Sequence, residues 1–250
     1  MRKALIFSDV HLKAAASDRT RQRDLVRFLY EVDPTECERV ICVGDLFDFW
    51  FEYRHVIFSG YFDVLRAFAS LRDSRVALHL VCGNHDFWAG RFLEEELGFQ
   101  VHKNAVDLPF GDRNVRFVHG DGIDPKDHGY HIYKRIARNP FVMWAFRQLH
   151  PDWAMGLANF VSKTSRTRNE HRDPAQSRGA KALHAYAKRT LAAGEVDAVV
   201  CGHSHAPEME EYPMPEGKGL YINCGDWVKN RSYVVWDGAE FHLHAHRPPG

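Results

Sequence analysis

Apolar and polar residues alternate along the chain in a way that predicts buried strands followed by loops. Five short runs rich in Val, Ile, Leu and Phe each end in a polar cluster: KALIFSDVH from residue 3, ERVICVGDLFD from 38, VALHLVCGNHD from 76, NVRFVHGDG from 114 and DAVVCGHSH from 197. Runs of this length that stop at Gly, Asp, Asn or His are typical of buried strands. We therefore expect five core strands, each leading into a polar loop.

Two segments between these runs have the spacing of amphipathic helices. In residues 19–32, Leu25, Phe28 and Leu29 recur on one helical face, and residues 61–73 repeat the pattern. Strands that alternate with helices predict an α/β fold. Ligands of open α/β sheets bind beyond the carboxyl ends of the strands, so we expect the five polar clusters to converge.

Residues 126–192 break this rhythm. They contain Pro140, Pro151 and Pro174, several helix-like segments and no strand-like run, which predicts a helical insertion, or cap, before the last motif. The later segments GLYINCGDW, SYVVWDG and EFHLHAH predict short antiparallel strands. We expect one domain spanning residues 1–250, because a chain of 250 residues that is 45% hydrophobic can bury a full core.

Composition excludes some classes of partner and compartment. Lys+Arg and Asp+Glu are equal at 33 each, so the global charge gives no indication of nucleic acid binding. Five Cys without a C-x-x-C pair disfavour a disulfide framework or a thiolate zinc site and fit a reducing compartment. The start, MRKALIFSDVHL, has too short an apolar run for a signal peptide. We expect a cytoplasmic protein, with attachment to a membrane surface left open and no indication of oligomeric state.

The polar clusters supply a set of candidate metal ligands. Three are oxygen donors and four are imidazoles: Asp9, His11, Asp45, Asn84, His119, His203 and His205. This mixture suits Mn, Fe, Zn or Co better than Ca or thiolate-bound Zn. Seven donors exceed what one site with an open position uses, so they predict two metals that share a carboxylate. Two such ions are typical of enzymes that hydrolyse phosphoesters.

The ordered series DVH, GDLFD, GNHD, HGD and GHSH resembles the calcineurin-like metallophosphoesterase superfamily. The resemblance implies a β-sandwich flanked by helices and two divalent ions, expected to be Mn, with Fe, Co or Zn as alternatives. It implies that one ion is bound by Asp9, His11, Asp45 and His205, and the other by Asp45, Asn84, His119 and His203. It also implies that His85 stands near the leaving-group oxygen and that Asp86 orients His85.

A narrower resemblance is to the UDP-2,3-diacylglucosamine pyrophosphatases of lipid A synthesis. It rests on GDLFDFW, on HGDGIDPKDHGYHIYKR from His119, on the helical insertion and on GDW at 225–227. It implies attack of water on the α-phosphorus of a nucleotide-lipid, which yields UMP and the lipid-linked sugar 1-phosphate, at the cytoplasmic surface of the inner membrane. The expected substrate contacts are Asn84, His85, Tyr130, Arg166 and Arg168. The sequence departs from that family at His85, where many members have Arg.

Several alternatives stay open. A broader metallophosphodiesterase or phosphatase would act on soluble nucleotides, and a non-catalytic scaffold would keep the fold without turnover, although an intact set of buried Asp and His disfavours a scaffold. His85 either donates a proton or only orients. An apolar stripe in the insertion is either the inner face of a cap or a surface for acyl chains and the membrane; its residues are Phe141, Trp144, Ala145, Leu149, Trp153, Leu157 and Phe160.

Overall fold

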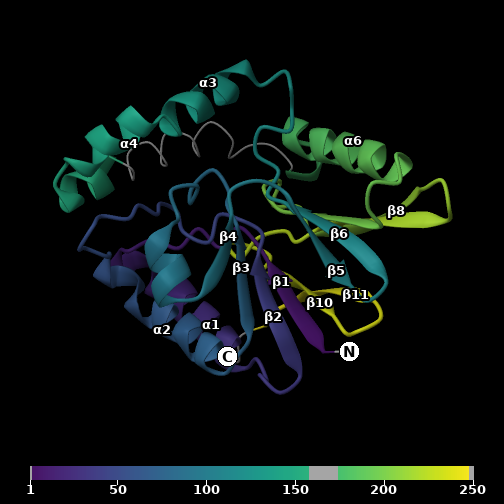
Figure 1. Ribbon diagram of the computed structural model, residues 1–250, viewed down its shortest axis with the longest axis horizontal. Helices are drawn as coiled ribbons and strands as arrows, with labels where there is room; N and C mark the ends of the chain where they lie inside the picture. The colour runs from purple at the N-terminus through teal and green to yellow at the C-terminus, as the bar shows by residue number, and fades with distance from the viewer. Residues whose placement is uncertain (1, 158–173, 248–250) are drawn as a thin grey trace.

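The computed structural model describes residues 2–157 and 174–247, which form two β-sheets packed face to face (Figure 1). The first sheet has the order β11-β10-β1-β2-β3-β4 and the second the order β5-β6-β7-β9-β8. The strands of the first are β1 Lys3–Phe7, β2 Cys37–Cys42, β3 Ala77–Val81, β4 Phe99–His102, β10 Ser232–Trp236 and β11 Phe241–Ala245. Those of the second are β5 Val106–Phe110, β6 Arg113–Val118, β7 Ala198–Cys201, β8 Glu208–Pro213 and β9 Lys218–Asn223.

The five predicted core strands are confirmed as β1, β2, β3, β6 and β7. Strands β1 to β4 are parallel, as are β6, β7 and β9, so their carboxyl ends point the same way within each sheet. One prediction was wrong: β9, within GLYINCGDW, runs parallel to β7 and antiparallel only to β8. The pattern also missed β4, β5 and β8, which are edge strands and therefore lack a continuous apolar run.

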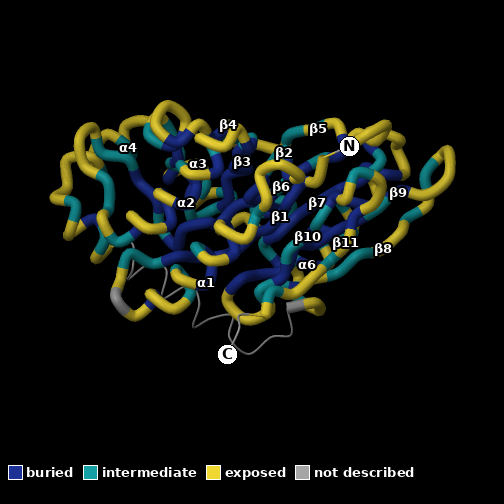
Figure 2. The backbone as a smooth tube through the Cα atoms, turned by 90° about the horizontal axis from the view of Figure 1, so that it is seen from below, coloured by how far each residue is buried: buried dark blue, intermediate teal, exposed yellow. Residues whose placement is uncertain are grey.

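Alternating residues of each strand divide the core into layers. Ile6 and Ile41 of the first sheet meet Phe117 of the second between the sheets. Leu5 and Phe7 point to the opposite face, which is covered by α1 (Arg19–Tyr30) and α2 (Phe62–Asp73). Helix α6 (Arg178–Ala192) covers the outer face of the second sheet. The protein is therefore a mixed α/β sandwich flanked by helices, as expected, and the buried segments in Figure 2 are concentrated in its strands.

The predicted insertion, residues 126–192, encloses two structures of different kinds. Helices α3 (His128–Ala137) and α4 (Pro140–Arg147) and the helical residues 151–157, together called the cap helices, lie beyond one end of the sheets (Figure 1). Helix α6, in contrast, packs directly on β7 and β9 and connects the strands of the second sheet. Among the described residues of the interval, the cap helices therefore comprise only those of 128–157.

The described residues of the apolar stripe face outward, so the first of its two interpretations, the inner face of a cap, does not hold for them. Trp153 is 74% exposed and Phe141 71% exposed. Trp144, Ala145, Leu149 and Leu157 are also exposed, and Phe160 lies outside the described residues. The contact with the domain is made instead by Phe146, whose ring centroid lies 4.9 Å from those of Phe51 and Trp88. Pro140 and Pro151 each begin a new helix, so the cap consists of separate helices with different orientations. Residues at helical spacing across such a break therefore need not lie on one common face.

Candidate metal centre

The backbone at the expected ligands has an uncommon conformation. Five of them have positive φ: Asp9 (52°), His11 (49°), Asp45 (52°), His203 (67°) and His205 (58°). In the described ranges, Arg75 and Arg231 are the other non-glycine residues with this property. A left-handed backbone costs an L-residue about 1–2 kcal/mol, and residues held this way gather at functional sites. Here the strain falls on the loops that carry the candidate ligands.

Hydrogen bonds between these loops bring the strand ends of both sheets together. The backbone N–H of Asp9 donates to Gly44 O at 3.0 Å, and that of His11 donates to Asp45 O at 2.9 Å. His203 N donates to Asp9 Oδ2 at 2.8 Å, which joins the second sheet to the first. The predicted convergence of the polar clusters is therefore confirmed.

Asp45 lies at the centre of the assembled side chains. Its Oδ2 is 3.3 Å from His119 Nε2, 3.8 Å from His11 Nε2 and 4.0 Å from His85 Nε2. Its Oδ1 accepts the backbone N–H of His85 at 2.9 Å. Asp45 is only 2% exposed, so a buried carboxylate faces histidines from three different loops. This is the position that a shared ligand requires.

The remaining expected ligands surround Asp45. Asp9 Oδ1 lies 3.3 Å from His205 Nε2 and 3.6 Å from His11 Nε2. The rings of His119 and His203 meet edge to face with centroids 5.1 Å apart. We call the seven side chains the ligand cluster: Asp9, His11, Asp45, Asn84, His119, His203 and His205.

Three atoms of the ligand cluster indicate directly that a cation fits. Asp9 Oδ1, Asn84 Oδ1 and His119 Nε2 are buried without a hydrogen-bond partner. Buried polar atoms are almost always hydrogen-bonded, and two oxygens and an imidazole nitrogen from three separate loops are all suitable metal ligands. Bound divalent ions would supply the missing partners of all three atoms.

Glycines next to the ligands allow this close approach. A Cβ at Gly83 would overlap the Asp45 carboxylate, and a Cβ at Gly202 would overlap the Asp9 carboxylate. The motifs GNH and GHSH therefore need a residue without a side chain at these positions.

The charges in the ligand cluster favour a bound cation. Burial alone would raise the pKa values of Asp9 and Asp45, but neighbouring histidines outweigh burial and lower both, so the carboxylates stay ionised. Burial and His119 lower the pKa of His203 to about 4, which keeps its imidazole neutral. The pKa of His119 is raised despite burial, because Asp45 and Asp9 attract a positive charge. Ionised carboxylates and neutral imidazoles are the forms that bind metals, so a bound metal ion would displace the proton that His119 otherwise holds.

Asp48, rather than Asp86, contacts His85. His85 Nδ1 lies 2.7 Å from the Asp48 carbonyl oxygen, to which it can donate, and 3.9 Å from Asp48 Oδ1. Asp86 is fully buried and accepts the backbone N–H groups of Gly83 (2.7 Å) and Leu46 (2.8 Å). The prediction that Asp86 orients His85 is therefore wrong: its two oxygens join the GNHD loop to the GDLFD loop.

The sequence carries a local signal for Asp48. Asp48 stands between Phe47 and Phe49 in an aromatic run, and a carboxylate in such a run needs a partner once it is buried. Its Oδ1 lies 3.6 Å from His11 Nδ1, so it faces both a candidate ligand and His85. In addition, Asp48, His11 and His85 each bring one atom close enough to the others to share an ion.

Of the expected substrate contacts, Tyr130 lies beside the ligand cluster. Its hydroxyl donates to Asp121 Oδ2 at 2.6 Å, and Lys134 Nζ is 2.7 Å from the same oxygen. Trp88 Nε1 donates to the Ala137 carbonyl oxygen at 3.0 Å. Both contacts attach α3 to loops that carry ligands. Arg166 and Arg168 lie outside the described residues.

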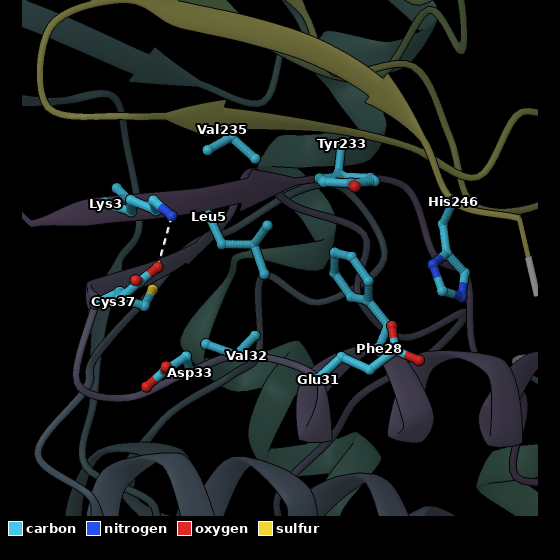
Figure 3. Close-up of a pocket in the computed structure, with 12 residues that line it drawn as sticks. Lys3, Leu5, Phe28, Glu31, Val32, Asp33, Cys37, Tyr233, Val235 and His246 are labelled. Atoms are coloured by element: carbon cyan, nitrogen blue, oxygen red, sulfur yellow. Dashed lines mark hydrogen bonds and ion pairs between the residues drawn. The ribbon is translucent and has the colours of Figure 1, made fainter.

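A separate pocket lies at the opposite end of the first sheet (Figure 3). It is lined by Lys3 and Cys37, at the beginnings of the parallel strands β1 and β2, and by Phe28, Tyr233 and His246. The ligand cluster follows the other ends of these strands. This pocket is therefore not part of the candidate metal centre.

Comparison with known proteins gives the family. The calcineurin-like phosphoesterase family matches residues 2–207. The UDP-2,3-diacylglucosamine hydrolase of Porphyromonas gingivalis is 31% identical, with 97% of both chains covered. The enzymes of the same name from Aeromonas hydrophila (26% identical, 97% of this chain and 98% of the relative) and Pseudomonas putida strain F1 (27%, 96% and 97%) are also similar. The chain belongs to the calcineurin-like phosphoesterase family and is a metal-dependent phosphoester hydrolase.

Proposed function

We propose that this hydrolase cleaves the pyrophosphate of UDP-2,3-diacylglucosamine and releases UMP and 2,3-diacylglucosamine 1-phosphate. The relatives that carry this name match the chain over almost its full length, cap helices included. The observation that carries the chemistry is the buried Asp45 carboxylate, which faces histidines of several loops.

The ligand cluster divides into two sets that share Asp45. We infer that Asp9, His11, Asp45 and His205 would hold one divalent ion, and Asp45, Asn84, His119 and His203 the other. When bound, the ions supply Lewis acidity toward phosphoryl oxygens and lower the pKa of an attacking water. Mn is our proposal for both, and mixed nitrogen and oxygen donors are equally compatible with Fe, Co or Zn.

His85 fits an orienting role in this reaction better than that of a proton donor. Its Nδ1 faces the Asp48 carbonyl, which leaves Nε2 to face the ligand cluster. Burial lowers the pKa of His85, so the neutral imidazole is favoured. A sugar 1-phosphate is stable as an anion and leaves without a proton, so a general acid is not required. With Nδ1–H donating to Asp48, the neutral ring presents Nε2 to the ligand cluster as an acceptor, which has no proton to give to a leaving group.

The substrate proposal is tested by comparing three substrates with Mn²⁺-loaded enzyme: UDP-2,3-diacylglucosamine, UDP-N-acetylglucosamine and bis(p-nitrophenyl) phosphate. We expect kcat/KM to be at least about 10²-fold higher for the first, because binding energy from remote parts of a substrate is used in the transition state. Its products should be UMP and the sugar 1-phosphate. Equal values for all three would instead establish a broad phosphodiesterase, and no turnover with Mn²⁺, Co²⁺, Fe²⁺ or Zn²⁺ would establish a scaffold.

We also propose that the cap helices contact the cytoplasmic membrane surface, where a substrate with two acyl chains resides. No helix in residues 2–157 or 174–247 is long and apolar enough to span a bilayer. The exposed Phe141 and Trp144 share α4 with Arg147, while the exposed Trp153 lies on the helical residues 151–157 and the exposed Arg135 on α3. Apolar and basic side chains in this combination are typical of helices that lie in the membrane interface.

Replacing Trp153 by Asp should weaken binding to phosphatidylethanolamine/phosphatidylglycerol vesicles by about tenfold or more, since burial of an aromatic side chain contributes roughly 2 kcal/mol. Co-sedimentation measures the effect. Tyr30→Asp is the matched control, because Tyr30 is an exposed aromatic residue (52%) on α1, away from the cap helices. Equal losses in the two variants, or none in Trp153→Asp, would contradict the proposed docking face.

A further inference from the structure

The β9–β10 loop, taken together with the strand-end residues Asn223 and Ser232, supports the candidate metal ligands from outside the stretch that the family match covers, which ends at residue 207. We propose that Asn223, the last residue of β9, is a positioning residue that fixes His203 and His205 for metal binding. The inference rests on the proposed ligand set and is independent of the substrate.

Asn223 uses its whole side-chain amide to hold the GHSH loop. It is fully buried at the end of β9, in register with Cys201, the last residue of β7. Its Nδ2 donates to Ser204 Oγ at 2.7 Å and to the Gly202 carbonyl oxygen at 3.1 Å. Its Oδ1 accepts the backbone N–H of Gly225 at 2.9 Å. One side chain therefore contacts the residue before His203 and the residue between the two histidines.

The GHSH loop needs such support because its conformation is strained. His203 and His205 both have positive φ, each at a cost of about 1–2 kcal/mol, and this geometry persists only when surrounding contacts determine it. On one side of the loop, Asp9 Oδ2 accepts the N–H of His203. On the other side, Asn223 binds Gly202 and Ser204. The two contacts fix the direction of the histidine side chains.

Two other residues of the same loop form hydrogen bonds with the backbone of ligand-cluster residues. Trp227 N donates to the Asp9 carbonyl oxygen at 3.1 Å, and Asn230 Nδ2 donates to the His205 carbonyl oxygen at 3.1 Å. The loop therefore contacts the backbone on both sides of the His203–Asp9 hydrogen bond. Asn223 differs from Trp227, which acts through its backbone, and from Asn230, which reaches only the His205 carbonyl, because the Asn223 side chain binds both Gly202 and Ser204; a substitution can therefore remove these contacts selectively.

Asn223→Asp tests the proposal, because Asp has the same shape but lacks the two amide donors. We expect the dissociation constant for Mn²⁺, measured by isothermal titration calorimetry, to rise about 10–100-fold, the usual effect of losing an outer partner of a metal ligand. At saturating Mn²⁺, most of the kcat should return. Ser232→Ala is the matched control: Ser232 is a buried residue of the same loop, and its hydroxyl donates to Cys224 O at 2.6 Å.

A second variant separates positioning from a general effect on folding. Ser204→Ala removes one acceptor of the Asn223 amide and should weaken Mn²⁺ binding in the same direction, and the double variant should lose less than the sum of the two. Mn²⁺ affinity of Asn223→Asp within twofold of the unsubstituted protein, or equal to that of Ser232→Ala, would overturn the proposal. If Asn223→Asp does not fold, Ser204→Ala alone decides by the same criterion. If the unsubstituted protein bound Mn²⁺ but did not hydrolyse UDP-2,3-diacylglucosamine, only the proposed substrate would be refuted, and the role of Asn223 would still be decided by the Mn²⁺ affinities.

Discussion

The Asp45→Ala variant is expected to lose more than about 10²-fold in kcat/KM while it keeps the fold of the parent protein. Loss of an outer partner of a metal ligand already costs 10–100-fold, so loss of a ligand proposed to be shared by both ions should exceed that range. Asp45 Oδ2 lies within 4.0 Å of a ring nitrogen of His119, His11 and His85. Steady-state kinetics at saturating Mn²⁺ measures the effect.

Two further measurements show whether a loss of activity in Asp45→Ala comes from weaker metal binding or from a change in the fold. Calorimetric titration of Asp45→Ala should show weaker binding of Mn²⁺, and its circular dichroism spectrum should match that of the parent. Asp197→Ala serves as the control: Asp197 Oδ2 accepts the N–H of Asn114 at 2.6 Å, at the opposite end of the second sheet. Full activity of Asp45→Ala would refute a mechanism with two ions that share this carboxylate.

Much of the fold was predictable because the buried strands carry a strong local signal. Four consecutive apolar residues that stop at a polar cluster identify β1, β2 and β7 without further information, and β3 has two runs of three on either side of His79. Edge strand β8, EMEEYP, has no such run, since most of its side chains are not buried. The direction of β9 depends on pairing with β7 across a long separation in sequence, which a local pattern does not encode.

The candidate ligands were predictable for a different reason. Each is the polar residue at a strand end, and the ends of parallel strands meet at one edge, so the sequence order and the α/β pattern place Asp9, Asp45 and His203 together. The supporting contacts are not local. Asn223 binds the GHSH loop from 19 residues away in sequence, and Asp48 approaches His85 from 37 residues away. No periodic sequence pattern links either pair of residues, because both contacts depend on how the loops pack in three dimensions.

The different roles of the two carboxylates near His85 lead to opposite expectations for two isosteric variants. Asp48→Asn removes the negative charge that faces His11 and His85, so we expect kcat/KM to fall about 10–100-fold with little loss of stability. Asp86→Asn instead places an amide NH₂ opposite one of the backbone N–H groups of Gly83 and Leu46.

A donor facing a donor leaves both unpaired in a fully buried site, which costs about 1–3 kcal/mol in the free energy of unfolding. Urea denaturation of both variants, combined with kinetics at saturating Mn²⁺, therefore separates a catalytic partner from a structural one. If Asp86→Asn were as stable as the parent and lost as much activity as His85→Ala, while Asp48→Asn stayed active, Asp86 would be the partner of His85 after all. The hydrogen bonds favour the reverse, because both oxygens of Asp86 are already occupied by backbone N–H groups.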